Sequence, residues 1–231
     1  LSNAQTAFNS WKKTPLAHRA ELMRKAGNIL RDDIEIFAKM ITLEMGKPIS
    51  ESRGEINKCA WVCDYYADNA AAFFADEVIP TDASNSYVRH DPMGCVLAIM
   101  PWNFPFWQVF RFAAPTLMAG NVGLLRHEPN EFGCAIQIED IFKKAGFPAD
   151  AFPNLIVHHD RSEMIVEHNA VKAVTLTGSD MAGAAVADIA GRHIKKTLLE
   201  LGGNNAFIVW EDADIALAVK KALTARMLNC G

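Results

Sequence analysis

The chain has 231 residues, of which 50% are hydrophobic and 22% charged, the composition of an ordinary globular domain. Its formal net charge of −4 gives no electrostatic basis for binding nucleic acid or an anionic membrane surface. No apolar run approaches the ~20 residues that a membrane span requires, and no signal peptide is visible. We therefore expect neither nucleic acid nor a membrane as a partner.

The five cysteines favour a reducing compartment. Their number is odd, and no two have the CxxC spacing of a redox or zinc motif. Cys59 and Cys63 lie four residues apart on an expected helix, where two buried thiols are the more common arrangement and a metal or redox pair is the alternative. The sequence thus predicts a cytoplasmic protein, and no metal site is expected.

The first part of the chain, about residues 1–75, is predicted to be helical. Apolar residues recur at three- and four-residue spacing in Ala20–Leu30 and Ile34–Ile41, which is typical of amphipathic helices. Pro15 is placed to begin a helix and Gly46 to end one. Glu55–Phe74 carries an aromatic stripe, which more often serves packing than ligand binding.

Further along, a polar connector over Asp76–Ser86 precedes two short strand candidates, Tyr87–His90 and Gly94–Met100. From Phe106 onwards helices and strands alternate. The expected helices are Phe106–Met118, Glu131–Ala145, Ser162–His168, Ser179–Ala190 and Ile215–Leu228, and the expected strands are Val122–Leu125, Asn154–Val157, Val171–Leu176, Lys196–Glu200 and Ala206–Val209. This alternation predicts an α/β fold in which a doubly wound parallel sheet has helices on both faces.

A loop with two prolines follows the strand candidate at Gly94–Met100. Pro101 and Pro105 each fix a backbone φ angle and remove a donor, so the residues between them should be held rigidly. The amide of Asn103, placed at the carboxyl end of a strand, can stabilise a developing oxyanion. An ordinary turn is the alternative, because asparagine and proline are common in turns.

A second candidate site lies where Val174–Thr177 leads into Gly178 and Ser179. The glycine allows a tight turn and close approach by a phosphate, and the serine can cap the helix that follows. Gly183 would let this helix pack closely against the sheet. The pattern is not the six-residue dinucleotide-binding fingerprint, and a capped turn without a ligand remains the alternative.

Glu200 ends a predicted strand and is followed closely by Gly202 and Gly203. A carboxylate that projects into a glycine-lined cleft can act as a general base. The alternative is a glutamate at a strand end that is simply exposed to water.

Four motifs occur in one order along the chain: Ile99–Pro105, Ala119–Asn121, Thr177–Ser179 and Leu199–Gly203. Their order and spacing resemble those of the NAD(P)-dependent aldehyde dehydrogenase superfamily, and most of all its bacterial succinate-semialdehyde dehydrogenase group. The resemblance covers nearly the whole chain. It implies an NAD(P)-binding domain with a helical layer at about 1–75 and a bridging-arm strand near 86–100 that takes part in oligomer contacts.

The resemblance also implies NAD or NADP as the cofactor. The cofactor-binding positions that it suggests are Ile99, Met100, Pro101, Trp102, Arg126, Gly178, Ser179, Gly183, Leu201 and Gly202. Arg126 stands where the family usually has a lysine that reaches the adenosine ribose, and it should attract a 2′-phosphate. Glu128 should repel one if it points at the ribose, and Pro129 replaces a glutamate common in NAD-preferring members. The choice between NAD and NADP therefore stays open.

The implied activity is the oxidation of a small aldehyde, with succinate semialdehyde the first candidate, to the carboxylic acid. In the family a cysteine thiolate attacks the aldehyde to give a thiohemiacetal and then an acyl-enzyme, which Asn103 would assist by holding the oxyanion and Glu200 by activating water. The resemblance places that cysteine, and the catalytic domain, beyond Gly231, and Cys230 is not expected to replace it. We expect these residues alone to be inactive.

In its full-length form the protein is expected to be a homo-oligomer, a dimer or a tetramer. Two other functions stay open. One is a truncated protein that binds nucleotide without catalysis, and the other is an interaction module that uses the oligomer surfaces of the family.

Overall fold

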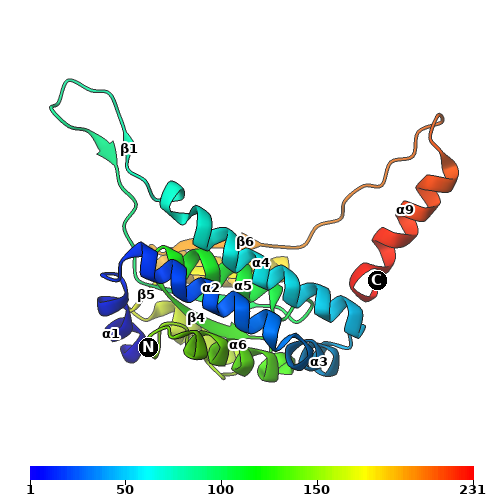
Figure 1. Ribbon diagram of the computed structural model, residues 1–231, viewed down its shortest axis with the longest axis horizontal. Helices are drawn as coiled ribbons and strands as arrows, with labels where there is room; N and C mark the ends of the chain where they lie inside the picture. The colour runs from blue at the N-terminus through cyan, green and yellow to red at the C-terminus, as the bar shows by residue number, and fades with distance from the viewer.

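Four parallel strands form the central sheet of the molecule. The structure is a computed structural model and describes residues 1–231. β3 (Cys95–Met100) lies between β4 (Val122–His127) and β5 (Val171–Thr177), and β6 (Lys196–Glu200) pairs with the other side of β5. The order is therefore β4-β3-β5-β6 (Figure 1). β3, β4 and β5 are short, almost entirely buried apolar runs, as expected for a sheet covered on both faces.

Helices cover both faces of this sheet. α5 (Trp107–Met118) and α6 (Phe132–Ala145) pack on one face, whereas α1 (Ser2–Trp11), α7 (Ser162–Glu167) and α8 (Asp180–Arg192) pack on the other. Side chains of β3 alternate between the two cores, because successive residues of a strand point to opposite faces. The α/β fold with a doubly wound parallel sheet, predicted from the sequence, is confirmed.

A layer of three further helices lies over α5 and α6. α2 (Leu16–Asp32), α3 (Ile34–Met45) and α4 (Ile49–Phe73) bury their apolar stripes against this face, and Gly46 ends α3 in the left-handed conformation. The aromatic stripe of α4 is only partly used for packing, since several of its rings are half-exposed and contact one another.

One predicted strand makes no strand pairing at all. Ala206–Val209 has no regular structure and lies in an exposed segment that runs away from the body in Figure 1. It leads to α9 (Ile215–Met227), after which Asn229 and Cys230 contact the body again. The apolar run has strand-like composition, but no neighbouring strand offers backbone partners to it here, and an isolated strand does not hold its own hydrogen bonds.

Two other expectations need correction. Asn154–Val157 forms no strand and makes a single bridge, from Asn154 to Leu125, because the Val157 N–H, which would extend the ladder, donates to the Leu155 carbonyl at 2.9 Å. The expected connector contains β1 (Glu77–Val78), which pairs antiparallel with β2 (Tyr87–Val88). These two strands form a hairpin that extends well away from the body (Figure 1).

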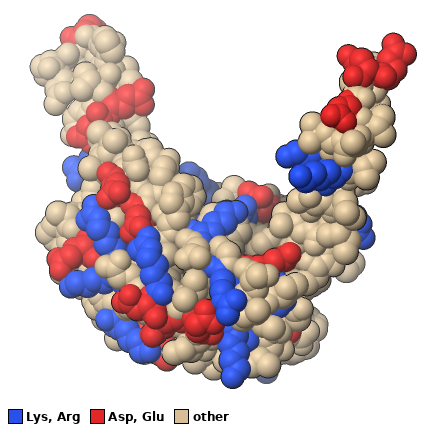
Figure 2. All heavy atoms as spheres, turned by 45° about the vertical axis from the view of Figure 1, so that its right-hand side comes forward, with Lys and Arg blue, Asp and Glu red and all other residues tan.

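The surface shows no segregation of charge on the face drawn in Figure 2, where acidic and basic side chains are interspersed over the body. None of the helices combines the length and the apolar character that crossing a bilayer would require.

Candidate active site

The candidate site lies where the winding of the sheet changes direction. The chain passes from β3 to β4 on one side, whereas β5 lies on the other side of β3, and ligands of such sheets bind at the carboxyl ends of the strands at this point. A pocket of about 420 Å³ opens there. It is lined by Pro101, Trp102, Asn103, Gln108, Arg111, Thr177, Gly178, Ser179, Glu200, Leu201 and Gly202.

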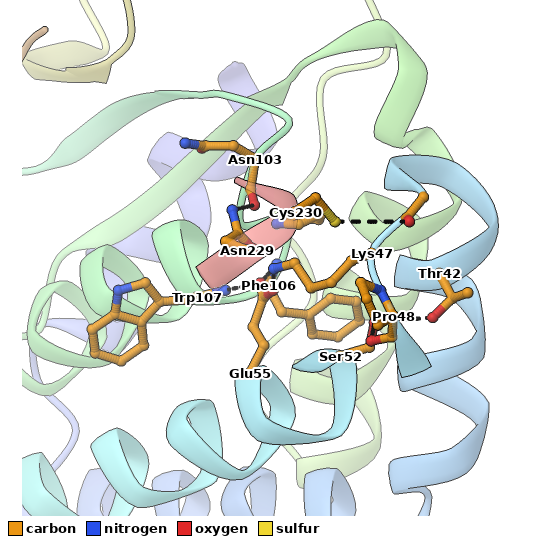
Figure 3. A network of polar contacts seen from close by, with 12 residues as sticks. Thr42, Lys47, Pro48, Ser52, Glu55, Asn103, Phe106, Trp107, Asn229 and Cys230 are labelled. Atoms are coloured by element: carbon orange, nitrogen blue, oxygen red, sulfur yellow. Dashed lines mark hydrogen bonds and ion pairs between the residues drawn. The ribbon is translucent and has the colours of Figure 1, made fainter. Parts of the chain in front are cut away.

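The loop that carries Asn103 is held from the helical layer. Glu55, on α4, accepts hydrogen bonds at one carboxylate oxygen from the N–H groups of Phe106 and Trp107, both at 2.8 Å. These are among the first N–H groups of α5, which have no partner inside the helix. The other oxygen of Glu55 forms an ion pair with Lys47, and both side chains are 1% exposed (Figure 3).

His127, the last residue of β4, also contacts this loop. Its Nδ1 accepts a hydrogen bond from the Glu128 N–H at 2.8 Å, so the ring proton lies on Nε2, which donates to the Pro105 carbonyl at 2.9 Å. The ring is fully buried, and this burial lowers the pKa of His127 to about 4. The loop is thus fixed through a neutral imidazole.

This burial predicts a dependence of stability on pH. Between pH 6.5 and 4 the imidazole of His127 is protonated in the unfolded state but stays neutral in the folded state. The free energy of unfolding therefore falls as the pH is lowered, by about 2 kcal/mol between pH 7 and 5. His127→Gln has no such group. The stability deficit of this variant, measured by urea unfolding at both pH values, should shrink by this amount at pH 5. A deficit that is independent of pH would contradict the prediction.

The amino terminus of α8 forms the opposite wall. Ser179 caps the helix by accepting a hydrogen bond from the Ala182 N–H at 3.2 Å. A carboxylate oxygen of Asp180 accepts from the Gly202 N–H at 3.1 Å, which ties the segment after β6 to this helix. Gly183 is buried, and a Cβ atom there would lie 2.5 Å from the Leu201 side chain, so any larger residue at this position would have to displace Leu201.

Glu200 lies next to a positively charged side chain in the pocket. Arg111, on α5, places Nη1 at 3.6 Å from a Glu200 carboxylate oxygen and donates from Nη2 to the Thr177 hydroxyl at 3.4 Å. Both charged side chains are partly exposed, at 38% and 52%. A second hollow, of about 230 Å³, shares these three residues and Gln108 with the first pocket. Glu200 and Arg111 thus line both spaces.

The comparison with known proteins shows the family of the chain. The chain matches the aldehyde dehydrogenase family over residues 1–231. It belongs to the aldehyde dehydrogenase family. The resemblance found in the sequence motifs is thereby confirmed.

Several members of the aldehyde dehydrogenase family are close relatives. The chain is 52% identical to a probable succinate-semialdehyde dehydrogenase [NADP(+)] of a Synechocystis strain, and 44% identical to a succinate semialdehyde dehydrogenase [NAD(P)+] of Escherichia coli, each over 231 residues. All of this chain is covered, but only 51% and 50% of those proteins. The chain spans about half the length of the curated relatives it matches.

Solved structures of the family agree. The succinic semialdehyde dehydrogenase of Streptococcus pyogenes, solved in complex with NADP⁺, is 36% identical, with a TM-score of 0.95 over 99% of this chain and 50% of that chain. An NAD complex of PnpE gives a TM-score of 0.94 at 30% identity, over 99% of this chain and 47% of that chain.

Most of the predicted site residues of this aldehyde dehydrogenase chain line one pocket, but four do not. Met100 lines the second hollow, and Ile99 is buried in the sheet. Arg126 lies opposite Ile99 on β4, 6% exposed, and its buried Nε has no hydrogen-bond partner. Gly183 lies beneath Leu201.

Sequence reasoning missed two polar residues of the pocket, Gln108 and Arg111, and gave no role to the side chain of Thr177. Gln108 and Arg111 are three residues apart on the helix that follows the Asn103 loop, so they share one face. This spacing was a usable signal, but a polar helical face is more often exposed to solvent.

None of the five cysteines lines the pocket. Four are buried elsewhere, and Cys230 is exposed, with its thiol directed at the Gly46 carbonyl at 3.9 Å. Its neighbour Asn229 donates to the Asn103 carbonyl at 3.0 Å (Figure 3).

Proposed function

We propose that this chain is the cofactor-binding part of a dehydrogenase that oxidises an aldehyde, succinate semialdehyde first among them, to the carboxylic acid with NADP⁺ or NAD⁺. One observation carries the proposal: Asn103, Glu200 and the Gly178–Ser179 turn line a single pocket at the switch point of the sheet. The names of the two curated relatives reported above support the substrate.

The residues present fit a dinucleotide. The amino terminus of α8, opened by Gly178 and Ser179, offers backbone N–H groups without partners inside the helix, as a pyrophosphate requires. Arg126 is buried with an unused Nε donor, which an adenosine ribose or its 2′-phosphate would satisfy. The bound cofactor would supply the hydride acceptor of the reaction.

The polar residues of the pocket have distinct roles in this proposal. The amide of Asn103, held rigidly by Glu55 and His127 through the backbone of its loop, donates to the oxygen that gains negative charge. Glu200 accepts a proton from the water that releases the acid. These roles require a cysteine nucleophile that none of the five cysteines described above provides, so we propose that these 231 residues alone turn over no aldehyde.

Arg111 gives the pocket its affinity for a semialdehyde that carries a carboxylate. It is the cationic side chain among the residues that line the pocket, and its guanidinium is within reach of Glu200 and Thr177 rather than committed to a short, buried ion pair. A guanidinium can bind a carboxylate through two parallel hydrogen bonds.

The hairpin β1–β2 is proposed to make contacts in a homo-oligomer, a dimer or a tetramer, of the full-length form. Its exposed residues include Val78, Tyr87 and Val88, which are 73%, 46% and 44% exposed and offer apolar surface to a second copy. The free cysteines suit the cytoplasm as the compartment.

The cofactor proposal predicts the behaviour of Arg126→Leu. NADPH and NADH should both bind the unaltered chain, as followed by the fluorescence of the reduced nicotinamide and by calorimetry. The variant should bind NADPH about tenfold or more weakly, because one charge-assisted hydrogen bond is lost. NADH should lose less affinity, since it lacks the 2′-phosphate.

Arg192→Gln is the control, because Arg192 lies at the far end of α8, with its side chain 55% exposed. The same samples, mixed with succinate semialdehyde and NADP⁺ or NAD⁺, should show no growth of absorbance. Binding unaffected by Arg126→Leu would refute the cofactor site, and steady turnover by the unaltered chain would refute the proposed inactivity.

A further inference from the structure

A cluster of potential metal ligands lies away from the pocket, where α3 meets the start of α6. It consists of Glu44 on α3, Glu131 in the short 3-10 turn (Pro129–Glu131) before α6, and Cys134 in the first turn of α6. One ligand atom of each residue lies within 4.8 Å of the others. Glu131 and Cys134 are buried, and Glu44 is partly buried.

Glu44 is fixed in place by the backbone. Its two carboxylate oxygens accept hydrogen bonds from the N–H groups of Gly133 and Cys134, at 2.7 and 2.8 Å. A Cβ atom on Gly133 would lie 2.6 Å from a carboxylate oxygen of Glu44, so glycine leaves the space that this carboxylate occupies. Each oxygen keeps a second lone pair for a further partner.

Glu131 is the unusual member of the cluster. It is 1% exposed, and one of its carboxylate oxygens is buried without any hydrogen-bond partner. Buried carboxylates are normally paired or bound to a metal, because an uncompensated buried charge is costly. The nearby Lys47 is already paired with Glu55, so the carboxylates of Glu44 and Glu131 share no cation.

We propose that Glu44, Glu131 and Cys134 form a three-ligand site for a divalent transition-metal ion, with Zn²⁺ the ion best matched to the donors. Two carboxylate oxygens and one thiolate suit a tetrahedral Zn²⁺ or Co²⁺ ion with water as the fourth ligand, whereas the sulfur disfavours Mg²⁺ and Ca²⁺. Binding releases the thiol proton of Cys134 and any proton held by Glu131, and the three negative ligand charges then outweigh the divalent ion by one.

This site is independent of the proposed dehydrogenase activity. It would link the helical layer to α6 through the metal, since Glu44 comes from one and Cys134 from the other. The spacing of the three residues along the chain gives no sign of it, because Glu44 is distant in sequence from the other two and only the packing of α3 on α6 unites them.

Cobalt binding tests the proposal on the chain itself. In a Cys230→Ser background, which removes the exposed thiol, the chain is stripped with EDTA, desalted and titrated with CoCl₂ and with ZnCl₂. We expect a thiolate-to-cobalt charge-transfer band in the near ultraviolet, visible bands of a tetrahedral ion, and displacement of cobalt by zinc. Absence of the charge-transfer band would overturn the proposal whatever the variants show.

Two variants locate the ion. Cys134→Ala should abolish the charge-transfer band, and Glu131→Gln, which keeps the side-chain volume, should weaken zinc affinity in calorimetry by about tenfold or more. Cys63→Ala, at another buried thiol outside the cluster, is the matched control and should change neither. A band that persists in Cys134→Ala would also overturn the proposal, as would zinc affinity unchanged in Glu131→Gln.

Discussion

Glu55→Gln should lower the free energy of unfolding by about 3–5 kcal/mol, the usual cost of removing one partner of a buried ion pair. The glutamine oxygen can still accept from the Phe106 and Trp107 N–H groups, but its amide leaves the charge of Lys47 buried and uncompensated. Urea unfolding followed by far-ultraviolet circular dichroism measures the effect.

Glu35→Gln is the matched control for this prediction. Glu35 pairs with Arg53 through two hydrogen bonds, but the carboxylate is 64% exposed, so its loss should cost at most about 1 kcal/mol. Removing both charges of the buried pair, with Lys47→Met added to Glu55→Gln, should recover part of the lost stability. If Glu55→Gln and Glu35→Gln lowered the free energy of unfolding equally, the buried pair would contribute no more to stability than the exposed one.

Arg111→Gln should raise KM for aldehydes that carry a carboxylate and leave KM for other aldehydes unchanged. In the full-length enzyme we expect KM for succinate semialdehyde to rise about 10- to 100-fold, the loss of a hydrogen-bonded charge pair, with kcat changed much less. KM for butanal, which has no carboxylate, should stay the same. Steady-state kinetics with both aldehydes provides the measurement.

Butanal also controls for the contact between Arg111 and Glu200. If Arg111 acted only by orienting Glu200, the variant would lose kcat with both aldehydes equally, and the carboxylate-binding role would be wrong. Arg192→Gln, at the far end of α8 with a side chain that is 55% exposed, should behave as the unaltered enzyme.

Local signals in the sequence were enough for the sheet and for much of the pocket. The strand Lys196–Glu200 was predicted with the bounds that the structure shows, and β3, β4 and β5 within one or two residues of theirs. Asn103, Gly178 and Glu200 were each expected at a strand end. Since the ends of parallel strands meet at one edge, the topology brings these residues together.

Contacts distant along the chain could not be predicted in this way. Glu55 and Phe106 are 51 residues apart, and nothing near either residue signals that a helix of the outer layer caps α5. The side chain of Arg111 could have pointed to solvent, and the burial of Glu131 depends on how α3 docks. The missing strand at Ala206–Val209 is a related case, because strand formation needs a neighbour as well as an apolar run.

The anchoring of the Asn103 loop by Glu55 also has a consequence for the order of folding. The two N–H groups that begin α5 gain their partner only after α4 has docked, and closing so long a segment carries an entropic cost that local contacts do not. β3 and β4 can therefore pair before the loop between β3 and α5 takes its final form. On this order the loop that carries Asn103 takes its final form only with the arrival of the helical layer.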